Sequence, residues 1–139
     1  FANYSGARLP TEYEWEWIAT NRNKTIYPWG LEHPSTYKIN SNFLNNGPIH
    51  SIFLSSSNSL YNIGHLLGNV WEWTSTNEKN NIIPKGTNSS ICRVVKGGCW
   101  CMPSYLITIK SRKLIEPYNN YYETGFRLIK DKNKLSSLI

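Results

Sequence analysis

The clearest periodic pattern lies near the start of the chain. Trp15, Ile18 and Ala19 recur at the spacing of one helical face. Thr11 stands three residues before Glu14, which is the pattern of a capping box, where each side chain bonds the backbone amide of the other residue. The pattern therefore predicts a helix over residues 12–20 with one apolar face.

Short alternating segments follow this helix and predict strands. In residues 69–74, the indoles of Trp71 and Trp73 fall on one face, because successive strand residues point to opposite sides. Gly97 and Gly98 interrupt a second strand pattern, and paired glycines in a strand indicate a bulge or the close approach of another backbone. The predicted strands are 69–74, 93–100, 105–109 and 125–129, with a further short one at 49–54.

Between these segments the periodicity disappears. Residues 21–64 are rich in Asn and Ser and show turns rather than long elements. Long irregular loops are uncommon in compact domains unless a function or a bound ion orders them. The predicted fold class is therefore α+β: short antiparallel strands, one clear helix and long ordered loops in a single domain over residues 1–139.

Composition agrees with a folded domain and argues against a nucleic-acid-binding protein and against a membrane-spanning helix. Aromatic residues make up 14% of the chain and charged residues 17%, whereas a disordered chain is poor in aromatics. The net charge is +6, but the basic residues are scattered, apart from a tail at residues 130–139 that we expect to fray. This distribution gives no stripe for nucleic acid. No apolar run approaches the roughly 20 residues that span a bilayer.

The cysteines and histidines suggest little chemistry by their spacing. The cysteines are Cys92, Cys99 and Cys101, and the histidines are His33, His50 and His65. An odd number of cysteines is a poor disulfide framework. Cys99 and Cys101 would share one strand face, where neighbours bridge badly, so we interpret them as small, partly buried thiols. The histidines lack the spacing of a His-based metal centre.

Five motifs occur in order along nearly the whole chain. They are Gly6-Ala7-Arg8-Leu9-Pro10-Thr11-Glu12, Tyr27-Pro28-Trp29-Gly30, Gly68-Asn69-Val70-Trp71-Glu72-Trp73, Gly97-Gly98-Cys99-Trp100 and Gly125-Phe126-Arg127. In this order they resemble the sulfatase-modifying factors, the formylglycine-generating enzyme family. The resemblance implies a C-type-lectin-like fold of which this chain holds the later part. It also implies an upstream segment before Phe1 and an extracytoplasmic location.

The resemblance implies a chemistry that this sequence carries only in part. The founding enzymes are copper-dependent oxidases that convert a cysteine of a client sulfatase to formylglycine, using two cysteines after a Gly-Gly-Ser-Trp-like run. Soft thiolates suit Cu(I). If Ser104-Tyr105 is matched to the Ser-Tyr before the second cysteine, Leu106 stands where that cysteine is expected and Cys101 is the one candidate for the first. In the alternative, gap-free match to family members that lack the pair, Cys101 is a loop residue. We therefore expect a lone thiol at Cys101 and no copper centre.

The resemblance also implies a calcium ion under the Gly-Asn-Val-Trp-Glu-Trp run. Its ligands would be the carbonyl groups of Gly68 and Val70 and the carboxylate of Glu72, together with an Asn or Asp upstream. Calcium requires such oxygen ligands, but the upstream position is His65. Three alternatives stay open: a weakened site, another oxygen in place of His65, or Glu72 capping backbone amides.

Two functions therefore compete. The missing second cysteine favours a non-catalytic structural module that binds a protein partner, like the lipoproteins of gliding motility and type IX secretion. Loop tyrosines that would supply its contact surface are Tyr118, Tyr121 and Tyr122. The alternative is the copper-dependent oxidase. In either case Arg8, Arg112 and Arg127 are expected to pair inside the fold with Glu12, Glu14 or Glu16.

Overall fold

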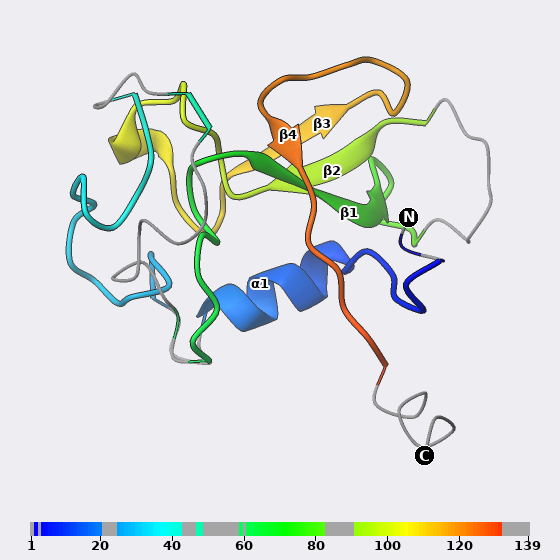
Figure 1. Cartoon of the computed structure of the whole chain (residues 1–139), viewed down its shortest axis with the longest axis horizontal. Helices are drawn as coiled ribbons and strands as arrows, with labels where there is room; N and C mark the ends of the chain where they lie inside the picture. Colours follow the sequence, from blue (N-terminus) through cyan, green and yellow to red (C-terminus); the bar gives the residue numbers. More distant parts are fainter. Residues whose placement is uncertain are drawn as a thin grey trace.

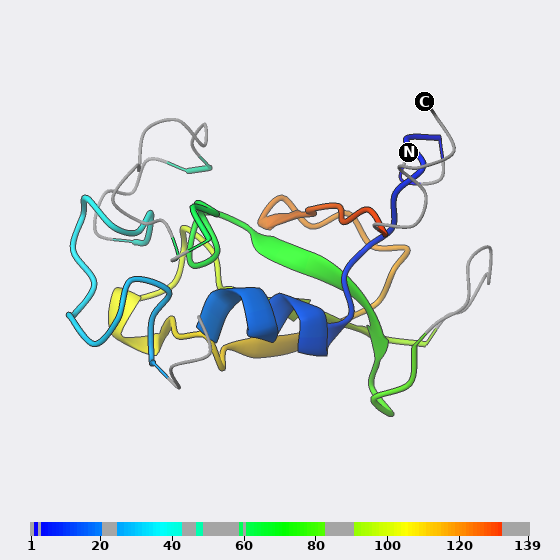
Figure 2. The same cartoon turned by 90° about the horizontal axis from the view of Figure 1, so that it is seen from below.

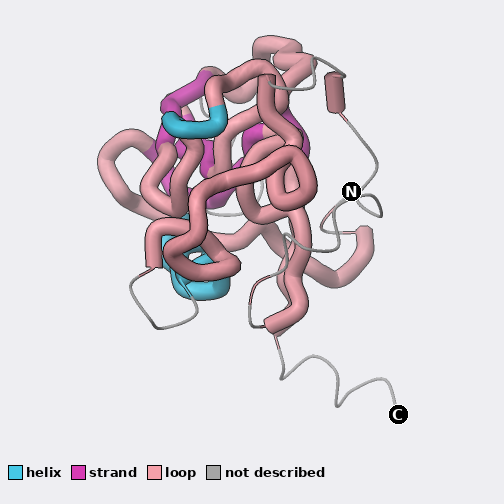
Figure 3. The backbone as a smooth tube through the Cα atoms, turned by 90° about the vertical axis from the view of Figure 1, so that its left-hand side faces the viewer, coloured by secondary structure: helices cyan, strands magenta, loops and turns pink. Residues whose placement is uncertain are grey.

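The computed structural model describes residues 2, 4–20, 25–42, 47–48, 59, 61–82 and 91–131. Within these ranges, one α-helix and four short strands carry the regular structure, and most of the backbone is loop (Figure 3). The elements are α1 (Glu12–Thr20), β1 (Trp71–Asn77), β2 (Arg93–Lys96), the 3-10 helix η3 (Ser104–Leu106), β3 (Arg112–Ile115) and β4 (Thr124–Gly125). None of the described helices is long and apolar enough to cross a membrane.

The strands form one curled sheet in the order β3-β2-β1-β4 (Figure 1). β2 lies antiparallel to both β1 and β3, as predicted, with Trp73 opposite Val95. β4 lies parallel to β1, with Glu72 opposite Gly125, so the prediction of a wholly antiparallel sheet is wrong. The loop after β3 carries the chain to the opposite edge of the sheet, and such a crossover brings the next strand back in the same direction.

Helix α1 packs against β1 and β2 on one side of the sheet (Figures 1 and 2). Its bounds are those predicted from the sequence. The amide of Thr11 donates to the Glu14 carboxylate at 2.8 Å, and the amide of Glu14 donates to the Thr11 hydroxyl at 3.1 Å. The capping box is therefore formed, and it fixes where the helix begins.

The core has two parts. The larger cluster lies against α1 and contains Trp15, Ala19, Tyr27, Ile39, Leu66, Leu67, Ile107 and Ile109. The smaller one contains Trp71, Val95, Cys99 and Ile115. Gly97 has φ +94°, and a Cβ there would lie 2.6 Å from the carbonyl oxygen of Leu66. The paired glycines therefore mark a close backbone approach, as predicted, but they follow β2 instead of interrupting it.

Two predicted strands differ in the structure. The segment 105–109 is not a strand: it begins in η3, where the amide of Ile107 donates to the carbonyl of Ser104 at 3.1 Å. Its alternating isoleucines, Ile107 and Ile109, are buried in the larger core cluster although the segment is not a strand. The third strand is instead β3, whose exposed Arg112 and Lys113 hide the pattern. The segment 125–129 pairs as a strand only at Gly125, and Ile129 forms a single bridge to Arg8.

Two other predictions fall mostly outside the described residues. They are the strand at 49–54 and, beyond residue 131, the basic tail at 130–139. Both stay predictions.

The Arg8–Glu14 ion pair gives α1 a pH-dependent anchor. Nη2 of Arg8 lies 2.7 Å from Oε1 of Glu14, and hydrogen bonds from Arg8 lower the pKa of Glu14 from 4.5 to about 2. Because the pKa is lower in the folded state, the pair stabilises the fold above the unfolded-state pKa of 4.5. That contribution is lost as the pH falls through the folded-state value of about 2.

Glu14→Gln should therefore destabilise the protein at neutral pH but not in acid. The expected loss is up to about 1 kcal/mol, because the pair is partly exposed, and glutamine retains the capping box. Urea unfolding of both proteins at a series of pH values would measure the difference, which should shrink toward zero between pH 4.5 and about 2. Glu116→Gln, at an exposed carboxylate, is the control. A difference independent of pH would contradict the assignment.

Candidate functional site

The cysteine candidate lies in a tight turn directly after the glycine pair. The amide of Met102 donates to the carbonyl of Cys99 at 3.1 Å, which closes the turn. The amide of Trp100 donates to the carbonyl of Asn69 at 2.8 Å and ties the turn to the Gly68–Val70 segment. Because the backbone turns here, the two cysteine side chains converge. Sγ of Cys99 lies 2.7 Å from Sγ of Cys101.

This contact corrects the expectation of a lone thiol at Cys101. The sequence suggested a strand, on which neighbouring side chains run parallel, whereas the turn brings them together. Cys99 is buried in the smaller core cluster, and Cys101 is exposed. Burial, reinforced by the hydrogen bond with Cys101, raises the pKa of the Cys99 thiol to about 12. At neutral pH the inner thiol is therefore protonated. Cys92, half-buried, lies just before β2.

The sulfur pair does not fit the two-cysteine copper centre that the resemblance implies. Leu106 occupies the position matched to the second cysteine, and it lies on η3 as an exposed side chain. Two sulfurs on one tetrahedral metal, with bonds of about 2.3 Å, are roughly 3.7 Å apart. The observed 2.7 Å is about 1 Å shorter. Among the described residues, no group of three or more His, Cys, Asp or Glu side chains is placed to hold a metal.

The Glu72 carboxylate, which is a candidate calcium ligand, forms an ion pair with Arg127. Nε of Arg127 donates to Oε2 at 2.5 Å and Nη2 to Oε1 at 2.6 Å, while Nε1 of Trp15 donates to Oε2 at 2.7 Å. Nη2 of Arg127 also donates to the carbonyl of His65 at 3.2 Å. As these side chains stand, the carboxylate does not fit a calcium ligand set, because a guanidinium group takes both oxygens. Calcium at Gly68, Val70 and Glu72 stays a prediction.

The arginine pairing was predicted correctly at two of three positions. Arg8 pairs with Glu14, and Arg112 pairs with Glu12 through Nε and Oε1 at 2.9 Å. Arg127 pairs with Glu72 instead of a helix carboxylate, because the Gly-Phe-Arg run leaves β4 beside the strand that carries Glu72. The third pair depends on the sheet register, which the sequence did not predict.

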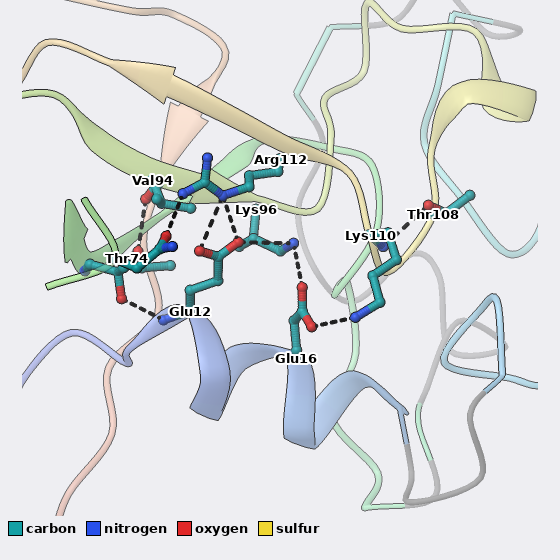
Figure 4. Close-up of polar contacts among 10 residues, drawn as sticks. Glu12, Glu16, Thr74, Val94, Lys96, Thr108, Lys110 and Arg112 are labelled. Carbon is teal, nitrogen blue, oxygen red and sulfur yellow. Dashed lines mark hydrogen bonds and ion pairs between the residues drawn. The ribbon is translucent and has the colours of Figure 1, made fainter. Parts of the chain in front are cut away.

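A charged network joins α1 to the sheet, and only its Arg112–Glu12 pair was predicted from the sequence. In Figure 4, Glu12 and Glu16 point from α1 toward Lys96, Lys110 and Arg112. Nζ of Lys96 is fully buried and lies 2.9 Å from Oε1 of Glu16 and 5.7 Å from the Trp15 ring centre. Burial works against ionisation of Glu16, but hydrogen bonds from Lys110 and Lys96 outweigh it and lower the pKa of Glu16. Each of the two helix carboxylates is paired with two cations: Glu12 with Lys96 and Arg112, and Glu16 with Lys96 and Lys110.

Two cavities flank the exposed face of α1. One, of about 710 Å³, lies between α1 and the turn that follows β1 at residues 78–80. Its wall includes Glu12, Glu16 and Arg112. The other, of about 310 Å³, is lined by Tyr13, Trp17, Ile18 and Ile129 with Glu14. Neither of these cavities is lined by a cysteine or by Glu72. The predicted site residues therefore lie elsewhere, along the junction of the 68–72 and 97–101 segments.

Comparison with known proteins identifies the family of the chain. Residues 1–132 match the model of the sulfatase-modifying factor enzyme 1-like domain. The hercynine oxygenase of Mycolicibacterium smegmatis is 29% identical over 94% of this chain and 35% of its own length. The formylglycine-generating enzyme of Bos taurus is 31% identical over 94% of this chain and 41% of its own length.

A solved structure supports the same fold. PvdO from Pseudomonas aeruginosa aligns with a TM-score of 0.70 at 17% identity, over 91% of this chain and 56% of that one. The chain thus spans about a third to a half of the length of the proteins it matches. Because residues 1–132 match this family model, the chain belongs to the sulfatase-modifying factor enzyme 1-like domain family.

Proposed function

We propose that the chain is part of a non-catalytic member of this family, in which the C-type-lectin-like domain is a structural and protein-binding module. The observation that carries the proposal is Leu106, a residue 53% exposed on η3 at the position of the expected second cysteine. Leucine offers no soft donor for copper. Oxidation of a client cysteine would therefore lack one of its metal ligands.

The loop between β3 and β4 is the contact surface that we assign to the module. Tyr118 and Tyr122 are 67% and 92% exposed, whereas Tyr121 packs against the smaller core cluster. The loop is held by its own bonds: the amide and hydroxyl of Thr124 both donate to the carbonyl of Tyr121, at 3.2 Å and 2.9 Å. Tyrosines held out on an ordered loop give contact area at low entropic cost.

The similarity to the bovine formylglycine-generating enzyme, 31% identical, favours a second candidate function, the copper-dependent oxidase. An assay of the full-length protein distinguishes the two. The protein would be given Cu(I), oxygen, a thiol reductant and a cysteine-containing sulfatase peptide, with the bovine formylglycine-generating enzyme as positive control. We expect mass spectrometry to find no formylglycine above the enzyme-free blank. Conversion of the peptide that is lost in Cys101→Ser would overturn the proposal and establish the oxidase.

The contact surface can be tested once a partner has been purified with the full-length protein. Tyr118→Ser combined with Tyr122→Ser should weaken that complex by about thirtyfold or more, because buried interface tyrosines contribute roughly 2 kcal/mol or more. The matched control is Tyr4→Ser, since Tyr4 is 95% exposed but lies near the start of the chain. Affinities would be measured by titration calorimetry. An unchanged affinity in the double variant would remove this loop from the interface.

A further inference from the structure

The two sulfurs of the Cys99–Cys101 turn are closer to bond formation than to metal coordination. Their separation of 2.7 Å exceeds a disulfide bond of roughly 2.05 Å by only about 0.7 Å. Residues two apart on an extended strand are separated by roughly 6.6 Å, and their side chains run parallel. The 99–102 turn removes that obstacle, and the bond from Trp100 to Asn69 holds the turn in place.

The two thiols are unequal in a way that gives each a role. Cys101 is exposed, so a dissolved molecule can reach its sulfur. Cys99 is enclosed by the smaller core cluster, and its sulfur contacts that of Cys101. Burial and the hydrogen bond with Cys101 keep the Cys99 thiol protonated by raising its pKa. That hydrogen bond is lost once Cys101 is modified, which makes Cys99 easier to deprotonate.

We propose that Cys99 and Cys101 are a reversible redox site that closes to an intramolecular disulfide by exchange with low-molecular-weight disulfides such as oxidised glutathione. The thiolate of Cys101 attacks one sulfur of the small disulfide and releases one small thiolate, leaving a mixed disulfide. Cys99 then gives up its proton and attacks the Cys101 sulfur, which releases the second small thiolate. The protein loses two electrons, the small disulfide gains them, and the two cysteine protons end on the two released thiols.

Peptide mapping of the full-length protein gives a direct test, because trypsin leaves Cys99 and Cys101 on one peptide and Cys92 on another. The peptide of residues 97–110 carries Cys99 and Cys101, and that of residues 86–93 carries Cys92. After equilibration with reduced and oxidised glutathione and alkylation, we expect peptide 97–110 to be lighter by two hydrogens and unalkylated. Reduction should restore two alkylation sites. Cys92, which sits on a separate peptide, is the internal control.

Two variants and the unfolded protein serve as controls. They show whether disulfide closure depends on the fold or is a reaction that any two exposed thiols would undergo. Cys92→Ser should keep the disulfide, and Cys101→Ser should abolish it. The equilibrium constant for closure should be roughly tenfold or more higher in the folded protein than in guanidinium, because the fold holds the sulfurs together. Three results would overturn the proposal: peptide 97–110 stays reduced, it accumulates the glutathione mixed disulfide, or folded and unfolded protein close equally well. The wild-type measurement does not depend on any variant folding.

Discussion

Replacing Glu72 by glutamine is expected to lower the free energy of unfolding by about 3 kcal/mol or more, since removing one partner of a buried ion pair leaves the other charge uncompensated. The Glu72 carboxylate accepts from Arg127 and from the indole of Trp15, and its side chain is only 8% exposed. Glutamine keeps the shape and an acceptor for Trp15 but not the charge. Urea unfolding of the full-length protein, followed by tryptophan fluorescence, would measure the loss.

Two further variants show whether that loss comes from the Arg127 pair. Glu32→Gln is the matched control, because the Glu32 side chain is 72% exposed and pairs with Lys38 at the surface. It should cost at most about 1 kcal/mol. Arg127→Met combined with Glu72→Gln should cost clearly less than the sum of the single changes, since neither charge is then left alone. Additive losses would mean that the two side chains are energetically independent.

Replacing Gly68 by alanine is expected to cost about 2 to 4 kcal/mol, because backbone strain and overpacking add at this position. Gly68 has φ +71°, and a Cβ there would lie 2.3 Å from the carbonyl oxygen of Asn40 and 2.5 Å from Cγ1 of Ile39. Its amide donates to the carbonyl of Gly97 at 2.8 Å. The new methyl group would therefore push the Gly68 backbone away from Ile39 and Asn40. The same unfolding measurement applies.

Substitution of a second glycine, Gly6, separates the cost of backbone strain from the cost of a steric clash. Gly6 has nearly the same φ, +64°, but in the described part of the chain no atom would lie within 4 Å of a Cβ at this position. Gly6→Ala should therefore show the conformational cost alone, about 1 kcal/mol. If Gly68→Ala were no more destabilising than Gly6→Ala, the close approach to Asn40 and Ile39 would not constrain the fold.

Local patterns predicted those features whose causes are local. The capping box of Thr11 and Glu14 lies within one turn of chain, so α1 could be placed to the residue. Strand β1 was found from its alternation, although it runs on to Asn77. Strand β3 was missed, because its ladder to β2 lies on an exposed surface where alternation is weak. The parallel edge β4 is too short to show a pattern.

The candidate site shows the same division more sharply. Spacing along a presumed strand suggested that Cys99 and Cys101 would not meet, and the turn reversed that conclusion. The buried Lys96 looks like any surface lysine in the sequence, yet it becomes the partner of Glu16 when α1 packs on β2. Arg127 pairs with Glu72 only because β4 joins the sheet beside β1.

The sequence by itself determined the family, the helix and its cap, and the glycines at which backbones approach closely. These depend on ordered motifs and on interactions between residues a few positions apart. The tertiary structure alone decided that Arg127 meets Glu72 and that the two thiols of the cysteine turn touch. Those contacts join residues such as Glu72 and Arg127, far apart in the chain, or depend on the sharp turn at Cys99–Cys101. Long-range packing, which no local pattern encodes, sets both.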